Sequence, residues 1–468
     1  MMKYGILRRR RCWPIALLAA VSLGGALAFV ASDHQQRDAA PPGQGSSVTA
    51  KRPGPGSACT GVALKPGSRV QAVISGAPAG TTFCFGRGVY RVSSLVPKSG
   101  DVLDGGGRAA VLDGGGSASY AVDGDSASPA PSGVTVRGFV IRGFRTPLQQ
   151  GAVQDDRGPG WIIEGNRITG NAAAGVATGD GVRVIGNQLD HNGQEGFSAH
   201  GNGGLYLGNE IAFNNLNLAV DPAWEAGGGK AWATRNLTFR SNYVHDNGGP
   251  GLWADTNNIN TTFDGNTVSN NWGPGIYEEI SYDATIINNT VTGNGMPSSP
   301  GGGQRLGWAW DAGIQVRESG GLSASSPLLI SHNTVADNYN GISLIQSPAS
   351  GCTGKGEGQY GPCKVQNVLV ENNRITMSQG ATGAYQDGAG NGIFSTGNNR
   401  FADNDYCVSS AAHPDDGHAP DWFAWMDGWL GFSGWQFYWP ETGGTYTAGG
   451  TCRSHSKMTL TWPPDRMP

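Results

Sequence analysis

The sequence predicts an all-β solenoid, a parallel β-helix closed by an N-terminal cap and a Trp-rich C-terminal cap. A motif with one layout recurs along the middle of the chain, and each copy contains a short β-branched or aromatic run. Gly supplies 77 of the 468 residues and Pro 26, which suits short strands joined by turns and disfavours helices. The net charge of −4 leaves no general basic surface, so we expect no nucleic-acid partner.

Residues 1–31 have the layout of a targeting segment. Arg8–Arg11 are basic, an apolar run of 18 residues follows from Trp13 to Val30, and Ala26–Ala28 offers small residues for cleavage. This layout predicts a signal peptide and a secreted, extracellular protein. Because a run of this length also crosses a bilayer, an uncleaved N-terminal membrane anchor on a cell-surface protein is the alternative. Residues 32–57, rich in Pro, Gly, Ser and Gln, read as a flexible linker.

The cysteines predict disulfides. Removal of Cys12 with the targeting segment leaves six, an even number that suits an exported chain. Nearness along the chain favours the pairs Cys59 with Cys84, Cys352 with Cys363, and Cys407 with Cys452. No pair has CxxC spacing and the histidines are scattered, so a structural zinc site is not expected.

The β-helix is predicted over residues 58–408. It opens with a cap in which residues 68–75 form a short helix and residues 81–92 alternate like strands. The repeats then follow from Val134. The first Asn of each copy is Asn166, Asn187, Asn209, Asn242, Asn266, Asn289, Asn333, Asn373 and Asn399.

Most intervals between these asparagines are in the low twenties, which is the spacing of a solenoid. No Leu framework with a helical half is present, so each repeat reads as one coil of several short strands. Asn suits the corners because it tolerates a left-handed backbone, and stacked corners predict an Asn ladder. The longer intervals predict insertions around residues 217–235, 296–311 and 347–364.

These repeats resemble the right-handed parallel β-helix proteins of the pectate-lyase-like superfamily. The resemblance covers roughly residues 60–408 and includes the opening QAVISGAPAGTTFCFGRGVYR from Gln71. The segments DPAWEAGGGKAW, GPGLWADTNN and GIYEEISY further resemble a bacterial subgroup of exported β-helix proteins. The resemblance implies the fold and a bias in function: many members cleave or epimerise polysaccharides on an exposed face of the coil, whereas others are adhesins or phage tailspikes.

Alignment of the coils on their turn glycines predicts two outward columns of side chains. The first column is Ser198, Ala219, Trp253, Tyr277, Gln315 and Ser343, and the second is His200, Asp221, Asp255, Glu279, Arg317 and Ile345. Carboxylates on neighbouring coils repel one another, so a row of three indicates a binding or catalytic role. Alternation directs Glu278 inward, unless the strand ends or bulges there or Glu278 and Glu279 exchange roles.

The columns define the candidate site. Asp255, Glu279, Asp221 and Arg317 are the predicted catalytic residues, and the predicted substrate-binding residues are Trp253, Tyr277, His200, Trp224, Glu225, Lys230, Gln315 and Trp310. Two structural roles stay open beside these functional ones. The inserted loops could simply cover Trp253 and Tyr277, and Asp221, which precedes Pro222, could be a turn residue. Residues 409–468 hold six Trp and read as a cap over the last coil rather than a separate sugar-binding module.

Two mechanisms fit this column. In a polysaccharide hydrolase, one carboxylic acid protonates the leaving oxygen and a second attacks carbon or activates water. Neighbouring coils suit a retaining enzyme, whereas Asp221 with Glu279, two coils apart, suits an inverting one. In a lyase, Arg317 or Lys230 is the base and the carboxylates hold Ca²⁺ against a uronate. The shortage of Lys and Arg around the column favours the hydrolase. The rival hypothesis is a non-catalytic glycan-binding or adhesion protein, and in either case we expect a monomer with a polysaccharide partner.

Overall fold

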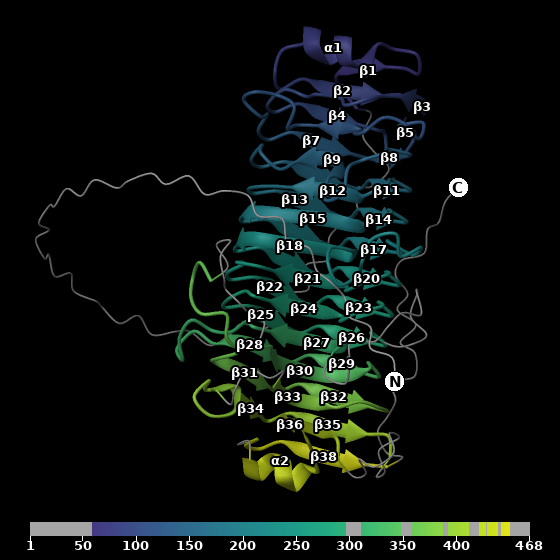
Figure 1. Cartoon of the computed structure of the whole chain (residues 1–468). Coiled ribbons are helices and arrows are strands. Elements are labelled where there is room, and N and C mark those ends of the chain that lie inside the picture. The colour runs from purple at the N-terminus through teal and green to yellow at the C-terminus, as the bar shows by residue number, and fades with distance from the viewer. Residues whose placement is uncertain are drawn as a thin grey trace, which may run out of the picture. The chain divides into compact units, whose positions relative to one another are not determined.

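The computed structural model describes residues 59–295, 310–347, 358–386, 392–410, 421–426, 428–438 and 441–449. The described chain is a parallel β-helix in which short strands stack coil upon coil between the helices α1 (Val70–Gly76) and α2 (Phe432–Tyr438) (Figure 1). The predicted fold class is therefore confirmed. The predicted targeting segment and linker lie outside the described residues. Within the described ranges, no helix is long and apolar enough to cross a membrane.

Three sheets run along the coil axis, and sheets A and B have 13 strands each. Sheet A contains β1 (Val62–Leu64), β2 (Thr82–Phe85), β4 (Val102–Asp104), β7 (Thr135–Arg137), β10 (Ile162–Glu164), β13 (Arg183–Ile185), β16 (Leu205–Leu207), β19 (Thr238–Arg240), β22 (Thr262–Asp264), β25 (Thr285–Ile287), β28 (Leu328–Ser331), β31 (Val368–Glu371) and β34 (Arg400–Ala402). Sheet B contains β3 (Gly88–Arg91), β5 (Ala110–Asp113), β8 (Phe139–Arg142), β11 (Arg167–Thr169), β14 (Gln188–Asp190), β17 (Glu210–Ala212), β20 (Tyr243–His245), β23 (Thr267–Ser269), β26 (Thr290–Thr292), β29 (Thr334–Ala336), β32 (Arg374–Met377), β35 (Asp405–Val408) and β38 (Thr445–Ala448).

Sheet C has 12 strands and carries the predicted site. It contains β6 (Val122–Asp123), β9 (Gly151–Asp155), β12 (Ala174–Thr178), β15 (Glu195–Asn202), β18 (Gly227–Arg235), β21 (Leu252–Asp255), β24 (Ile276–Glu279), β27 (Ala312–Arg317), β30 (Asn340–Gln346), β33 (Thr382–Gln386), β36 (Phe423–Met426) and β37 (Gly428–Leu430). Only β36 and β37 pair antiparallel among its strands. Residues 227–235, predicted as part of an insertion, are strand β18, so the inserted loop is confined to residues 213–226.

The repeated asparagines form two ladders at the coil corners. In the first ladder, between sheets A and B, each amide Nδ2 donates to the Oδ1 of the next Asn at 2.9–3.1 Å, from Asn166 to Asn373. The last member is Asn404 and not the predicted Asn399, which instead accepts from the backbone of Val368. A second ladder, between sheets B and C, runs from Asn171 to Asn338. The predicted structural role of the asparagines is confirmed.

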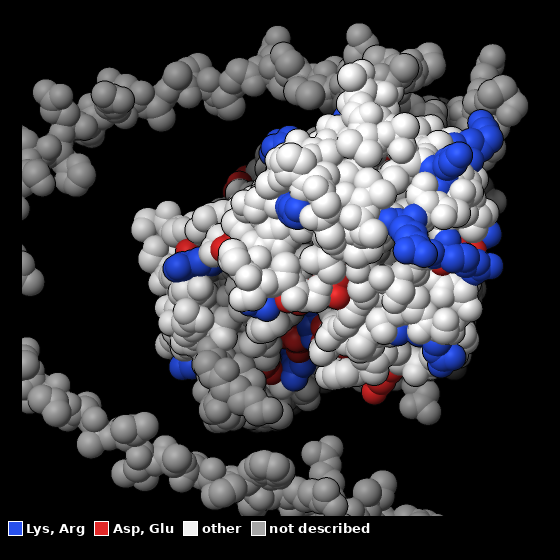
Figure 2. Space-filling view, turned by 90° about the horizontal axis from the view of Figure 1, so that it is seen from above, with Lys and Arg blue, Asp and Glu red and all other residues white. Residues whose placement is uncertain are grey.

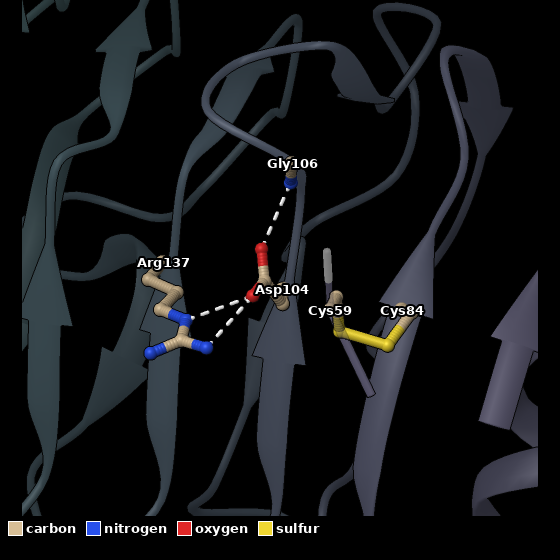
Figure 3. The surroundings of a disulfide bond; sticks show 5 residues. All are labelled: Cys59, Cys84, Asp104, Gly106 and Arg137. Carbon is tan, nitrogen blue, oxygen red and sulfur yellow. Dashed lines mark hydrogen bonds and ion pairs between the residues drawn. A yellow bond between two sulfur atoms is a disulfide. The ribbon is translucent and has the colours of Figure 1, made fainter. Parts of the chain in front are cut away.

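The two ends of the coil are covered by the predicted elements. At the N-terminal end α1 overlaps the predicted helical segment of residues 68–75 and ends one residue later, and Cys59 is disulfide-bonded to Cys84 as predicted (Figure 3). Cys363 and Cys407 are also disulfide-bonded, and their predicted partners lie outside the described residues. At the other end, the buried Trp435 of α2 packs edge-on against Phe401 of the last sheet A strand.

Arg137 on β7 shows how outward charges neutralise one another between coils. Its guanidinium donates to Asp104 Oδ2 at 2.8–3.0 Å, and the other oxygen of Asp104 accepts from the backbone of Gly106 (Figure 3). The aspartate thus both turns the chain after β4 and pairs with the next coil. The side chain of Arg137 is half-exposed, so the pair adds about 1 kcal/mol or less to stability.

His245 on sheet B predicts a pH-dependent stability. Burial alone would lower its pKa, but the hydrogen bond to Asp246, at 2.6 Å, and the Glu210 carboxylate, 3.5 Å from Nε2, raise the pKa above its ordinary value. A raised pKa stabilises the fold at pH below the unfolded value of about 6.5, and this contribution is lost as pH rises through the folded value. We therefore expect His245→Gln to lower the unfolding midpoint in urea more at pH 6 than at pH 9. An equal loss at both pH values would contradict this.

Candidate active site

A hollow of about 430 Å³ opens over the middle of sheet C. Its floor is made by outward side chains of β21, β24 and β27, and its walls come from the inserted loop and the turns before these strands. The lining residues are Pro222, Ala223, Pro250, Trp253, Trp272, Gly273, Pro274, Tyr277, Glu279, Trp310, Asp311, Gln315 and Arg317. Aromatic walls around a few charged groups are typical of a small-molecule or sugar site.

The strand register places most of the predicted columns side by side. Trp253 pairs with Tyr277 and Tyr277 with Gln315, while Asp255 pairs with Glu279 and Glu279 with Arg317. The coil before β21 is predicted wrongly: Lys230, not Ala219, pairs with Trp253. The Asn217–Leu218 pair that suggested the earlier alignment belongs to the inserted loop, because the strand of that coil starts ten residues later, at Gly227.

Asp221 is therefore not part of the carboxylate row. It is exposed in the inserted loop, where its Oδ1 accepts from the backbone N–H of Ala223 at 2.9 Å. This is the Asx-turn arrangement that stabilises a bend, so the alternative of a turn residue is the one that the structure supports. Without Asp221 in the row, the predicted inverting pair of Asp221 with Glu279 is also lost.

Lys230 is the centre of a buried charge cluster beside the hollow. Its Nζ lies 2.9 Å from Glu225 Oε2 and 2.7 Å from Asp255 Oδ2, and it donates to the Trp224 carbonyl at 3.0 Å. Burial alone would lower the pKa of Lys230, but Asp255 and Glu225 outweigh this and raise it. Because Glu225 and Trp224 belong to the inserted loop, Lys230 fastens that loop onto sheet C.

Glu279 is the buried carboxyl group that borders the hollow. Its Oε2 accepts from the indole Nε1 of Trp253 at 3.1 Å, and its Oε1 is paired with Arg317. Burial, followed by repulsion from Asp255, raises the pKa of Glu279 to about 7. A carboxyl group with this pKa is half-protonated at neutral pH, which is the condition for a general acid or base.

The rings of Trp253 and Tyr277 are buried, but the groups on the faces of Trp253 are side chains of neighbouring coils and not the inserted loops that the alternative named. Their rings stack with centroids 5.2 Å apart, and the Lys230 Nζ lies 4.1 Å from the centroid of the Trp253 ring. Lys230 and Tyr277 lie on the coils before and after Trp253, so they occupy its two faces. Trp253, which was predicted to bind substrate, therefore has no free ring face on which a sugar could stack. The indole instead orients Glu279 and contacts the Lys230 cation.

Two further buried side chains lie in the same strands. Glu278 is fully buried and points inward between Ala254 and Val316, so the strand neither ends nor bulges there, and burial raises its pKa well above the ordinary value. Gln315 is also fully buried and both atoms of its amide lack a hydrogen-bond partner. Because an unpaired buried amide is unfavourable, Gln315 at the edge of the hollow is well suited to bind a ligand hydroxyl.

The backbone is strained directly after the carboxylate row. Thr256 has φ of 60° and Ile280 has φ of 46°, which are left-handed values that β-branched residues rarely adopt. Thr256 follows Asp255 and Ile280 follows Glu279, and the backbone N–H of Thr256 donates to the Glu279 carbonyl at 3.0 Å. Strain of this kind costs on the order of 1–3 kcal/mol per residue and clusters at functional sites.

The remaining predicted residues lie around this centre. Trp310 packs over Arg317, with the guanidinium carbon 5.1 Å from a ring centroid, and Trp224 is exposed on the inserted loop. His200 lies two coils before Asp255 and its Nδ1 is 3.5 Å from Asp156 Oδ1.

Sequence reasoning missed three residues. Glu195 and Glu318 are buried carboxyls with raised pKa values, the first beside Glu225 and the second 3.2 Å from Arg317 Nε. Trp232 was assigned to a loop but lies on β18. The run of small residues from Gly227 to Gly229 is the signal that would have placed β18, because a Cβ at these positions would clash with the neighbouring coils, at Pro250, Gly251 and the ring of Phe197.

Some of the charged side chains meet in a recess of the surface. Figure 2 shows acidic and basic side chains together in one recess, while most of the surface in that view is uncharged. Among the described residues, no group of three or more His, Cys, Asp or Glu side chains has a geometry that would hold a metal ion.

Comparisons with known proteins identify the class of fold. A family model described as a right handed beta helix region matches residues 151–325. Two solved structures with similar folds are the A-modules of the mannuronan C-5 epimerases AlgE6 and AlgE4 from Azotobacter vinelandii. The AlgE6 module is 18% identical with a TM-score of 0.55, over 81% of this chain and 95% of that one. The AlgE4 module is 18% identical with a TM-score of 0.50, over 72% and 90%.

The protein thus has the right-handed parallel β-helix fold that the sequence resemblance implied. Curated protein sequences give no match to the chain. At 18% identity, the two similar structures define the fold and leave the chemistry to the residues of this chain.

Proposed function

We propose that this protein binds a polysaccharide along sheet C and cleaves it at the hollow, with Glu279 as the proton donor. The observation that carries the proposal is the environment of Glu279: a buried carboxyl group at the edge of an aromatic-walled hollow, with a pKa of about 7 beside a second carboxylate. Environments that raise the pKa of one acid of a pair are typical of acid–base catalysis.

The charge of the site favours a neutral glycan. Glu225, Asp255, Glu279 and Glu318 surround only two cationic side chains, Lys230 and Arg317, and each cation is already paired with carboxylates. A polyuronate would bring further negative charge to a site that has no unpaired cation among these residues. Neutral hydroxyls, by contrast, can be bound by the free amide of Gln315 and by carboxylate oxygens.

Asp255 is the second carboxylate of the proposed mechanism. Its Oδ2 lies 2.7 Å from the Nζ of Lys230, which holds the carboxyl group in place on the coil next to Glu279. In the proposed reaction Glu279 donates its proton to the glycosidic oxygen while Asp255 attacks the anomeric carbon, and the C–O bond to the leaving sugar breaks. Water, deprotonated by Glu279, then releases the sugar from Asp255 and restores both groups.

This arrangement predicts retention of anomeric configuration. Asp255 and Glu279 are register partners on neighbouring strands, about 4.8 Å apart, and this spacing is close to the roughly 5–5.5 Å that separates the carboxyls of retaining enzymes. We expect nuclear magnetic resonance of the first products to show the anomer of the substrate. An inverted first product would instead require a water between the two carboxyl groups and would exclude Asp255 as the nucleophile.

The experiment that tests the function is a panel of neutral and acidic polysaccharides incubated with the purified protein. Reducing ends measure hydrolysis, and ultraviolet absorbance of unsaturated sugars measures elimination. Glu279→Gln should abolish the activity, whereas Glu371→Gln, on β31 of sheet A, should leave it unchanged. Turnover that survives Glu279→Gln in full would remove this site.

A second candidate is proton abstraction from a uronate, as in a lyase or an epimerase. The observation that favours it is the presence of Lys230, Tyr277 and Arg317 along the same columns, and the two similar solved structures are epimerases of mannuronan. Unsaturated products, or deuterium incorporated into the polymer from heavy water, would support it over hydrolysis. Ca²⁺ dependence is expected only in this case.

We also propose that the protein acts outside the cytoplasm. The bond between Cys59 and Cys84 supports this, because disulfides persist mainly in oxidising compartments. Fractionation of cells that produce the full chain, followed by N-terminal sequencing, would distinguish a cleaved secreted form from an anchored one. Binding of glycans without turnover by the wild-type protein would favour the non-catalytic hypothesis.

A further inference from the structure

Trp232 is a large aromatic side chain that the proposed chemistry does not use. It lies on β18 and is 48% exposed, although its neighbour Ala231 is fully buried in the core. A large exposed aromatic ring on a strand next to a row of charged side chains is a candidate for recognition of a ligand. Its position in the columns of sheet C therefore decides what it can bind.

The register places Trp232 next to the end of the carboxylate row. Ala199 pairs with Ala231, and Ala231 pairs with Ala254. The register then shifts by one residue, because Gly201 pairs with Thr234 and the backbone N–H of Ala233 donates to the Thr256 carbonyl. Trp232 therefore lies one coil before Thr256, the residue that follows Asp255, on the side away from Glu279.

One face of the Trp232 ring is held by His200. The two rings stack with centroids 5.5 Å apart at 28°, and the His200 Nδ1 lies 3.5 Å from Asp156 Oδ1. Asp156 Oδ2 in turn accepts from the side chain of Gln154 at 2.9 Å. This chain of contacts fixes the orientation of the Trp232 ring from the N-terminal side and leaves its other face directed toward the coil of Asp255.

We infer that the face of Trp232 directed toward Asp255 forms a sugar subsite next to the reacting bond, and that this subsite selects neutral pyranoses with equatorial hydroxyls. The inference rests on the proposed function. Such rings have axial C–H bonds that make a flat apolar face, which can stack on an indole, while the hydroxyls at the ring edge reach Asp255. Asp255 has a short side chain, so the space above its coil, next to the Trp232 ring, is large enough for one sugar ring.

The length of one coil is similar to that of one sugar residue in an extended polymer. A glycan that runs along sheet C would then place successive residues over Trp232 and Asp255, over Glu279, and beside Gln315 and Arg317. The protein would bind the interior of a chain rather than its end, and products would be oligosaccharides. Because these strands are parallel, each coil presents its outward side chains at the same height, and each sugar residue would contact one coil.

The test compares Trp232→Ala, Trp232→Phe and Phe437→Ala in the full-length protein. Phe437 is an exposed ring on the remote helix α2 and serves as the control. Binding is measured by titration calorimetry with soluble glucan, xylan and alginate, and turnover is measured in parallel. We expect Trp232→Ala to weaken glucan or xylan binding at least about tenfold and to raise KM, while Trp232→Phe and Phe437→Ala stay within about threefold of wild type.

The outcomes separate this inference from the proposed function. Wild-type binding and KM in Trp232→Ala, with Glu279→Gln inactive, would overturn the subsite and leave the function. Loss of binding in Trp232→Ala without turnover by the wild type would support the subsite and overturn the function. Preference of the wild type for alginate, or no binding to any of the three polymers, would overturn the subsite as well.

Discussion

Replacement of Glu279 by Gln is expected to reduce turnover of the polysaccharide by about 10²- to 10⁴-fold, the usual contribution of a general acid. Gln keeps an oxygen that can accept from Trp253 Nε1, so the hollow and its walls should persist while the exchangeable proton is lost. The pH profile of the wild type should fall as pH rises above about 7, because only protonated Glu279 can donate. Turnover is measured as reducing ends across the pH range.

Two controls make this expectation specific. Glu371→Gln removes a carboxyl group from sheet A, far from the sheet that carries the hollow, and should keep the wild-type rate and pH profile. Asp255→Asn removes the neighbouring charge that helps to raise the pKa of Glu279, so any residual activity should show its alkaline limb at lower pH. An unchanged limb in Asp255→Asn would show that the two carboxyl groups are not coupled.

The fold was predictable because each coil repeats the same local signals. Asn at a corner and an apolar residue after the turn recur in copy after copy, and an error in one copy, such as Asn399 for Asn404, leaves the ladder intact. Strand alternation was equally reliable within a coil. It assigned Glu278 inward and Glu279 outward, and both assignments are correct.

The site was harder to predict because it depends on what differs between coils. In the coil of β18 the inserted loop offers Asn217 and Leu218 as a second apparent turn, and nothing local distinguishes it from the true strand start at Gly227. The alignment therefore slipped in one coil only. It put Ala219 in the place of Lys230, and it put the loop residue Asp221 into the carboxylate row.

The contacts across the sheet could not be derived from the sequence at all. That Trp253 donates to Glu279 and is covered by Tyr277 and Lys230 depends on side-chain rotamers in a close-packed row. The sequence identifies these residues as neighbours, but it does not state which faces are free. Trp232 is a different case. Its place on sheet C was missed because the sequence assigned residues 227–235 to an insertion, whereas they form β18.

The second large effect is expected from Lys230→Met, which should destabilise the protein by about 3–5 kcal/mol near pH 7. Met preserves the length and the apolar stem but leaves Glu225 and Asp255 buried without the cation that lies 2.9 Å and 2.7 Å from them. The inserted loop should also loosen, because Lys230 holds the Trp224 carbonyl at 3.0 Å. Denaturant unfolding measures the loss of stability, and limited proteolysis of the loop measures its release.

The pH dependence identifies the cause of that loss. Lys230 lowers the pKa of Glu225, so without Lys230 the folded-state pKa of Glu225 must rise further above its ordinary value. The variant should therefore lose stability as pH rises through the carboxyl range, and its deficit should shrink in acid, where Glu225 is protonated. Added Glu225→Gln should restore part of the stability at neutral pH, since it removes one unpaired charge.

The control is Arg240→Met, which breaks the exposed pair with Asp264 and should cost about 1 kcal/mol or less. A deficit in Lys230→Met that is equally small, or that does not vary with pH, would mean that water reaches this cluster and that the loop is held by its apolar contacts instead.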